Sequence, residues 1–198
     1  MAQLYYQGHG SFRITLRDNT VIYVDPFAGA GYDLPADLIL VTHDHYDHTA
    51  VDRMPHADGC RIITYAEALT DGQYHSFSAK GVEILSVPAC NKNHPIESCV
   101  GFVLTLDGVT LYASGDTSTT PAMGSQLHDM HLDYALLCGD GIYNMDIPEA
   151  SRCAALIGAK HTIPIHLKPG ELYDRSRAES FEAEGRILVE PGQVLELK

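Results

Sequence analysis

The sequence is short of positive charge and has no long hydrophobic run. Lysine and arginine together number 13 of 198 residues, against 26 aspartates and glutamates, and the formal net charge is −13. With no basic stripe to neutralise phosphates, we expect no nucleic acid as the main partner. No apolar stretch is long enough to cross a bilayer, so we expect no membrane insertion.

The N-terminus also lacks a basic, apolar leader. Residues 1–6 pass directly into a strand-like pattern, which predicts a cytoplasmic protein. The cysteines are odd in number and show no Cys-x-x-Cys spacing, so they support this location only weakly. We expect most of them to be small buried side chains, although Cys90 lies in a loop that we place near the site described below. The five are Cys60, Cys90, Cys99, Cys138 and Cys153.

What the chain does contain is a series of short apolar runs separated by turn residues, with no linker or repeat. This pattern predicts one domain, residues 1–198, in which two β-sheets pack face to face and helices cover them. Strands are predicted at residues 3–7, 12–16, 21–24, 37–42, 61–64, 73–77, 82–87, 101–106, 109–113, 134–138, 161–166, 187–189 and 194–197. Helices are predicted at residues 121–129, 146–157 and 171–184.

The most informative motif is a histidine cluster that follows the apolar run 38–41. It reads His43-Asp44-His45-Tyr46-Asp47-His48 and delivers several nitrogen and oxygen ligands to one point. Imidazole and carboxylate ligands suit zinc, manganese or iron, and two such ions can generate hydroxide at neutral pH. The alternative is a surface histidine cluster that binds no metal. The motif favours a metal-dependent hydrolase.

Other polar residues stand at the ends of later predicted strands. Asp116 follows the strand 109–113, and His166 closes the strand 161–166. We expect these strand ends to converge with the histidine cluster at one rim of the sandwich.

The landmarks of the whole chain resemble those of the metallo-β-lactamase superfamily, in its small single-domain hydrolases. They are Val24-Asp25-Pro26, the histidine cluster, Val87-Pro88-Ala89, Gly115-Asp116-Thr117 and Ile163-Pro164-Ile165-His166. The resemblance implies an α+β fold, a four-layer αββα sandwich of two mixed sheets flanked by helices. Gly8-His9-Gly10 and Gly141-Ile142-Tyr143-Asn144-Met145-Asp146 resemble a lactonase-like branch that includes L-ascorbate-6-phosphate lactonase.

By this resemblance two divalent metal ions are implied, most simply zinc, with manganese or iron as alternatives. The first ion would be held by His43, His45 and His94, the second by Asp47, His48 and His166, and Asp116 would bridge them. His94 has an alternative reading as a plain loop histidine, which would leave the first ion more weakly held. Asp47 would also be catalytic, since it can accept a hydrogen bond from the attacking water.

Five further residues are candidates for roles around the metals. Asp25 would orient a ligand histidine or simply form a turn, and His9 would lie near the site or be structural. Lys92 and Lys168 would hold a carboxylate or phosphate if their loops face the metals, and otherwise would be solvated. Tyr143 would donate a hydrogen bond to a developing oxyanion or would only pack.

Together these residues favour hydrolysis of a small ester, lactone or phosphoester by a hydroxide that bridges the metals. The flanking lysines suggest an anionic substrate. Two other classes stay open, an iron-dependent redox enzyme on the same fold and a non-catalytic metal-binding protein. The sequence does not define the substrate or the oligomeric state.

Overall fold

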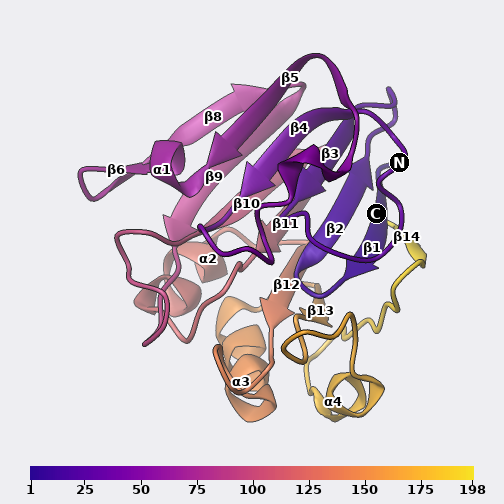
Figure 1. Ribbon diagram of the computed structural model, residues 1–198. Coiled ribbons are helices and arrows are strands. Elements are labelled where there is room, and N and C mark those ends of the chain that lie inside the picture. The colour runs from indigo at the N-terminus through magenta and orange to yellow at the C-terminus, as the bar shows by residue number, and fades with distance from the viewer.

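Two six-stranded β-sheets form the centre of the molecule in the computed structural model, which describes residues 1–198 (Figure 1). The first sheet has the order β14-β1-β2-β3-β4-β5 and the second the order β13-β12-β11-β10-β9-β8. The strands of the first sheet are β1 (Gln3–Gly8), β2 (Ser11–Thr15), β3 (Val21–Val24), β4 (Ala36–Val41), β5 (His56–Thr64) and β14 (Val194–Glu196). Those of the second are β8 (Ser76–Ala79), β9 (Val82–Pro88), β10 (Val100–Leu106), β11 (Val109–Ala113), β12 (Tyr134–Cys138) and β13 (His161–Ile165). A small hairpin joins β6 (Leu69–Thr70) to β7 (Gln73–Tyr74).

Both sheets are mixed, as the sequence predicted. Strands β3, β4 and β5 are parallel in the first sheet, and β11, β12 and β13 are parallel in the second. The remaining neighbours are antiparallel. Because the carboxyl ends of parallel strands meet at the same edge of a sheet, the loops that follow these strands begin at that edge.

The apolar core lies between the sheets and on the outer face of the second sheet. The first cluster comprises 28 buried residues from both inner faces, including Phe12 and Phe102. A second cluster of 19 residues joins the outer face of the second sheet to α3 (Ile147–Ile157) and to Phe181. The outer face of the first sheet has only a six-residue cluster around Tyr23, which loops and the short helix η1 (Val51–Arg53) cover. The four-layer fold class is confirmed, with a thin outer layer on this side.

The helix predicted at 146–157 is present as α3. Its N-cap is Asp146, whose carboxylate accepts a hydrogen bond of 2.8 Å from the backbone N–H of Glu149. It ends at Gly158, which has the left-handed backbone (φ +66°) that glycine adopts without strain.

Three other predicted elements are wrong in extent or type. The helix predicted at 171–184 is only α4 (Arg175–Ser180), because Asp174 caps it late and Phe181 turns to extended backbone. The predicted strand 187–189 is not a strand, and only an isolated bridge between Arg186 and Thr162 precedes it. The predicted helix 121–129 is divided at Ser125 into η2 (Pro121–Gly124) and α2 (Gln126–Asp129). A further one-turn helix, α1 (Tyr65–Ala68), follows β5. None of the helices has the length and apolarity that crossing a membrane would require.

The cap of α3 provides a test of local stability. We expect Asp146→Ala to lower the free energy of unfolding by about 1 kcal/mol, because the N–H of Glu149 loses its partner. Urea unfolding would measure the change, with an unaltered m-value showing that the folded state is the same. Asp58→Ala, at an exposed position of β5, is the control and should change the midpoint little. Equal stability of the two variants would contradict the capping role.

Candidate metal centre

Histidines and carboxylates gather at the edge where the parallel strands end. The cluster His43–His48 follows β4, Asp116 follows β11 and His166 follows β13. His94 comes from the loop after β9. Four of these five histidines are at most 3% exposed, His45 being the exposed one, and Asp116 is 3% exposed. Parallel pairing therefore brings to one place side chains that lie far apart in the sequence.

One group of donor atoms surrounds the Oδ2 atom of Asp116. His94 Nε2 lies 3.4 Å from this oxygen, His43 Nε2 lies 3.9 Å from it, and His94 Nε2 lies 3.2 Å from His45 Nδ1. The three histidines form a group whose ligand atoms are all within 4.8 Å of one another. This is the set that the resemblance implied for the first ion.

A second group surrounds the other oxygen of the same carboxylate. His48 Nε2 and His166 Nε2 each lie 3.5 Å from Asp116 Oδ1, and His166 Nε2 lies 4.0 Å from Asp47 Oδ2. The two oxygens of Asp116 thus face two separate sets of histidines. A bridging carboxylate has this arrangement.

The spacing of these atoms fits metal coordination better than direct hydrogen bonding. Ligands about 2.0–2.2 Å from a tetrahedral ion lie about 3.3–3.6 Å from one another, and most of the distances above are close to this range. Nε2 of His43, His48 and His166 and Oδ1 of Asp116 are buried without a hydrogen-bond partner. Buried polar atoms rarely lack a partner, so their convergence indicates that cations belong between them.

Asp25 orients two of the ligand histidines. Its Oδ2 lies 2.9 Å from Nδ1 of His48 and accepts a hydrogen bond of 2.7 Å from the Thr42 hydroxyl. The oxygen of that hydroxyl lies 3.0 Å from Nδ1 of His43 and can accept its proton. In their neutral forms both rings therefore carry the proton on Nδ1, and the lone pair of Nε2 then faces the centre.

Asp140 has the corresponding role on the opposite side, and sequence analysis missed it. Its Oδ2 lies 3.3 Å from His166 Nδ1 and accepts a hydrogen bond of 2.7 Å from the Asn144 amide. The chain of hydrogen bonds continues from Asn91 to Asn144 (2.9 Å), and Asn91 accepts from Nδ1 of His94 (2.8 Å). Burial would raise the pKa of Asp140, but the hydrogen bonds from His166 and from backbone N–H groups lower it. Its signal was available, since it follows β12 as Asp116 follows β11.

His9 contacts the second group directly. Its Nε2 lies 3.1 Å from Asp47 Oδ2, and its ring lies 3.7 Å from the ring of His166, centroid to centroid. Nδ1 lies 3.1 Å from the carbonyl oxygen of Glu171 and must donate to it, because a carbonyl only accepts. Burial would raise the pKa of Asp47, but the hydrogen bond with His9 and the charges of His48 and His166 together outweigh it and lower that pKa to about 2.

The charges of the cluster depend on one another. Burial would lower the pKa of His48, but the carboxylates of Asp116 and Asp25 outweigh it and raise that pKa to about 9. For His43, burial and the neighbouring His48 lower the pKa to about 2. Burial would raise the pKa of Asp116, yet the surrounding histidines hold it far below its usual range. Without a metal, a proton on His48 balances the buried carboxylate, and an incoming cation must displace it.

Two glycines make room for the ligands. A Cβ on Gly10 would lie 3.0 Å from the ring of His48, and one on Gly115 would lie 2.8 Å from the side chain of Thr42. Gly115 also has a left-handed backbone with φ of +58°. A larger residue at either position would come too close to these side chains, which explains why both positions are glycine.

Three site residues that are not glycine share this left-handed backbone. Asp25 and His166 have φ of +46° and His9 has φ of +57°. Such conformations are uncommon for these residue types and concentrate at functional sites. Their presence here agrees with the clustering of metal-ligand chemistry at this edge.

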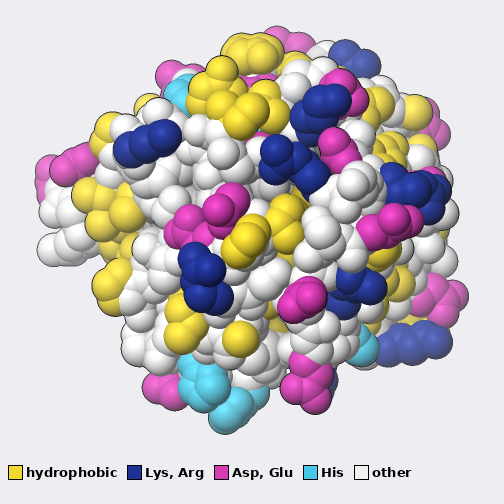
Figure 2. Space-filling view, turned by 90° about the horizontal axis from the view of Figure 1, so that it is seen from below, with side chains coloured by type: hydrophobic (Ala, Val, Ile, Leu, Met, Phe, Trp, Pro, Cys, Tyr) yellow, Lys and Arg dark blue, Asp and Glu magenta, His cyan; other side chains and the backbone are white.

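A pocket of about 390 Å³ opens over the donor atoms. Besides five predicted metal ligands it is lined by Tyr46, Asn93, Tyr143, Pro169 and Gly170. Lys92 and Lys168 do not line it, and Nζ of Lys168 lies 2.5 Å from Glu171 Oε1. Seen from below in Figure 2, basic and acidic side chains are interspersed, with no large basic patch on that face.

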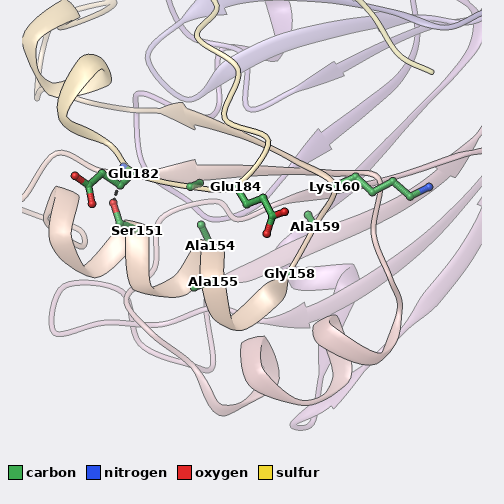
Figure 3. A pocket seen from close by; sticks show the side chains of 9 residues that line it. Ser151, Ala154, Ala155, Gly158, Ala159, Lys160, Glu182 and Glu184 are labelled. Carbon is green, nitrogen blue, oxygen red and sulfur yellow. Dashed lines mark hydrogen bonds between the residues drawn. The ribbon is translucent and has the colours of Figure 1, made fainter.

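A larger cavity lies elsewhere in the molecule. It has a volume of about 560 Å³ and lies between the second half of α3 and residues 182–184 (Figure 3). Its lining is mostly alanine and glycine, with Ser151, Lys160, Glu182 and Glu184 at its sides. No histidine lines it, and none of the side-chain groups that could hold a metal ion includes its residues, so we place the functional site at the smaller pocket.

Comparison with known proteins agrees with this placement. A family model described as "Beta-lactamase superfamily domain" matches residues 3–166. The chain belongs to this family. The matched segment contains all seven predicted ligands, and the metallo-β-lactamase fold is confirmed by solved structures that share it.

Among relatives, a UPF0173 metal-dependent hydrolase of Thermococcus onnurineus is 29% identical over the full length of both chains. A crystal structure from Parabacteroides distasonis, named as a metal-dependent hydrolase, is 27% identical with a TM-score of 0.75, covering 96% of this chain and 92% of that one. CmlA of Streptomyces venezuelae, a diiron β-hydroxylase, has a TM-score of 0.74 at 14% identity, covering 99% of this chain and 54% of its own. The last likeness is one of fold alone.

In total, the structure brings together all seven residues that the sequence suggested as ligands. Asp25 and His9 contact these ligands, and Tyr143 lines the pocket. The two lysines stand outside it. Asp140, Asn144 and Asn91 are the residues that sequence analysis did not find.

Asp116, whose two oxygens face two groups of histidines, provides the first test of the site. We expect Asp116→Asn to reduce bound metal from about two ions per chain to one or fewer, because an amide nitrogen cannot replace the second coordinating oxygen. Elemental analysis after gel filtration would measure it. Asp133→Asn, at a carboxylate that pairs with Lys160, is the control and should keep its metal. Full metal content in Asp116→Asn would contradict the bridging role.

Asp140 provides a second test. Asp140→Asn keeps the shape but removes the charge that faces His166, so we expect metal affinity to fall about 10- to 100-fold. Competition against a chromophoric chelator would measure the affinity, with circular dichroism to verify the fold. An affinity within about twofold of the parent would show that the network is not needed to hold the ligands.

Proposed function

We propose that the protein is a binuclear metal-dependent hydrolase that cleaves a small ester, lactone or phosphoester. The observation that carries this proposal is the buried Asp116, whose two oxygens face two separate groups of histidine nitrogens, three of which have no hydrogen-bond partner. Relatives are named as metal-dependent hydrolases, which supports the same class. Neutral imidazole with carboxylate is the donor set that zinc uses in catalytic sites, and manganese and iron fit it as well.

The residues around the pocket have defined parts in such a reaction. Bound divalent ions would lower the pKa of water to about 7 and polarise the scissile group. Asp47 lines the pocket and is ionised, so its carboxylate can accept a hydrogen bond from the attacking water and orient it. His9 fixes that carboxylate through the contact at Oδ2.

Water is excluded from one side of the site only. His43, His48, His166 and Asp116 form a buried base, whereas Asp47, at 18% side-chain exposure, faces the open pocket. A substrate can thus approach from the mouth while the ligands stay dry. Electrostatic interactions are stronger at this buried inner end of the pocket than they would be in bulk water.

A second candidate is an iron-dependent redox enzyme. The His and Asp donor set also suits iron, and the diiron β-hydroxylase shares the fold. The metal bound by the native protein would distinguish the two classes. A non-catalytic role is disfavoured because the complete set of seven ligands is present. For location, we propose the cytoplasm.

Metal removal tests the proposed activity. We expect protein purified without added metal to hydrolyse p-nitrophenyl acetate or a simple γ-lactone. Dialysis against a chelator should remove at least about 95% of this activity, and zinc or manganese should restore it, because the water loses its activating ions. Elemental analysis on the same samples would relate activity to metal content. Activity that survives complete metal removal, or a preparation with two irons and no hydrolysis, would contradict the hydrolase assignment.

A further inference from the structure

We infer that the pocket recognises an uncharged, apolar group of its substrate through the rings of Tyr46 and Tyr143. The inference rests on the proposed hydrolytic function, since it concerns the part of the substrate outside the scissile bond. It assigns a chemical class to that part and differs from the anionic substrate that the two lysines suggested.

Exposure is the first argument. The chain has 16 phenylalanine and tyrosine residues and no tryptophan, and only Tyr46 and Tyr143 are exposed, at 76% and 52%. Both line the pocket that opens over the donor atoms of the predicted metal ligands. Ile142, next to Tyr143, is 55% exposed. Exposed apolar side chains that gather at one mouth mark a binding surface more often than a chance arrangement.

Both tyrosines are also held in place before any ligand binds, Tyr46 through its ring and Tyr143 through its backbone. The ring of Tyr46 meets the ring of Phe27 edge to face at 5.7 Å. The backbone of Tyr143 is fixed at both ends, since its N–H donates to Asp140 (2.7 Å) and its carbonyl accepts from the Asn93 amide (2.8 Å). A contact surface that is fixed in advance loses little conformational entropy on binding.

Charge is the third argument. No lysine or arginine lines the pocket, and Lys168 is paired with Glu171 outside it. The amide nitrogen of Asn93, which does line the pocket, already donates to Tyr143. A carboxylate or phosphate placed against the tyrosines would lose hydration without gaining a cationic partner. An alkyl or aryl group would instead gain from leaving water.

A matched series of esters tests this inference. The substrates are p-nitrophenyl acetate, butyrate and hexanoate, with mono-p-nitrophenyl glutarate as the anionic counterpart of similar length. We expect kcat/KM to rise along the neutral series by about 10-fold or more and to be lower for the glutarate than for the hexanoate. Tyr46→Ala and Tyr143→Ala should each reduce the hexanoate-to-acetate ratio about 5-fold, because the apolar contact is lost.

Conservative variants separate the ring from its hydroxyl. Tyr46→Phe and Tyr143→Phe should keep the hexanoate-to-acetate ratio, since the ring remains. Leu156→Ala removes an exposed apolar side chain at the far end of α3 and is the control, with no expected change. An unchanged ratio in both alanine variants, or a preference for the glutarate, would overturn the inference. Equal loss of kcat on every ester in Tyr143→Phe would instead assign its hydroxyl to the reaction.

A binding measurement keeps the inference separate from the proposed activity. Hexanohydroxamate and acetohydroxamate share a metal-chelating head, so calorimetry on the zinc-loaded protein compares the tails without catalysis. We expect the longer tail to bind about 10-fold more tightly, and Tyr46→Ala with Tyr143→Ala to abolish the difference. If no ester is hydrolysed but this difference is found, the proposed reaction fails and the apolar subsite stands. Equal affinities of the two hydroxamates would sink the subsite.

Discussion

The buried carboxylate of Asp116 is the constraint on which the rest of the site depends. An isolated carboxylate at 3% exposure would be strongly unfavourable in an apolar interior, and it is tolerated only with cationic partners. Its neighbours here are His48 and His166 at one oxygen, both with a raised pKa, and His43 and His94 at the other, both with a lowered pKa. Protons can supply part of the compensating charge, and divalent ions can supply all of it. Metal binding thus completes the interior electrostatics and the chemistry together.

Two other carboxylates fix the orientation of the histidine rings around Asp116. Asp25 follows β3, and its Oδ2 lies 2.9 Å from Nδ1 of His48. Asp140 follows β12, and its Oδ2 lies 3.3 Å from Nδ1 of His166. Each stands on a different sheet, so the two sheets hold the centre from opposite sides. Both carboxylates are needed because packing alone would not stop a ligand ring from rotating and turning its Nε2 away from the centre. The fold therefore arranges the metal-binding side chains through these two carboxylates as much as through the positions of the ligands themselves.

Local sequence patterns could predict the fold class and the ligand types, because both depend on short-range signals. Alternating apolar runs predicted the strands, and polar residues at their ends predicted where chemistry would gather. The hydrogen-bond chain from Asn91 to Asp140 could not be predicted, since Asn91 and Asn144 are 53 residues apart and meet only in space. The helix predicted at 171–184 failed because a buried Phe181 in extended backbone overrides local propensity. The lysines failed to reach the pocket for a similar reason, since loop direction is set by packing.

The base of the pocket is polar and buried, whereas its mouth is apolar and exposed. Polar groups at the base are buried and left without partners, and apolar rings at the mouth are exposed, so both arrangements are unfavourable for the protein alone. Each unfavourable arrangement is relieved by a different ligand, a cation at the base and an apolar group at the mouth. Selection for stability alone would have given the buried polar groups partners and covered the exposed rings. Their coexistence within one pocket of about 390 Å³ is the argument for a site that binds metal and substrate side by side.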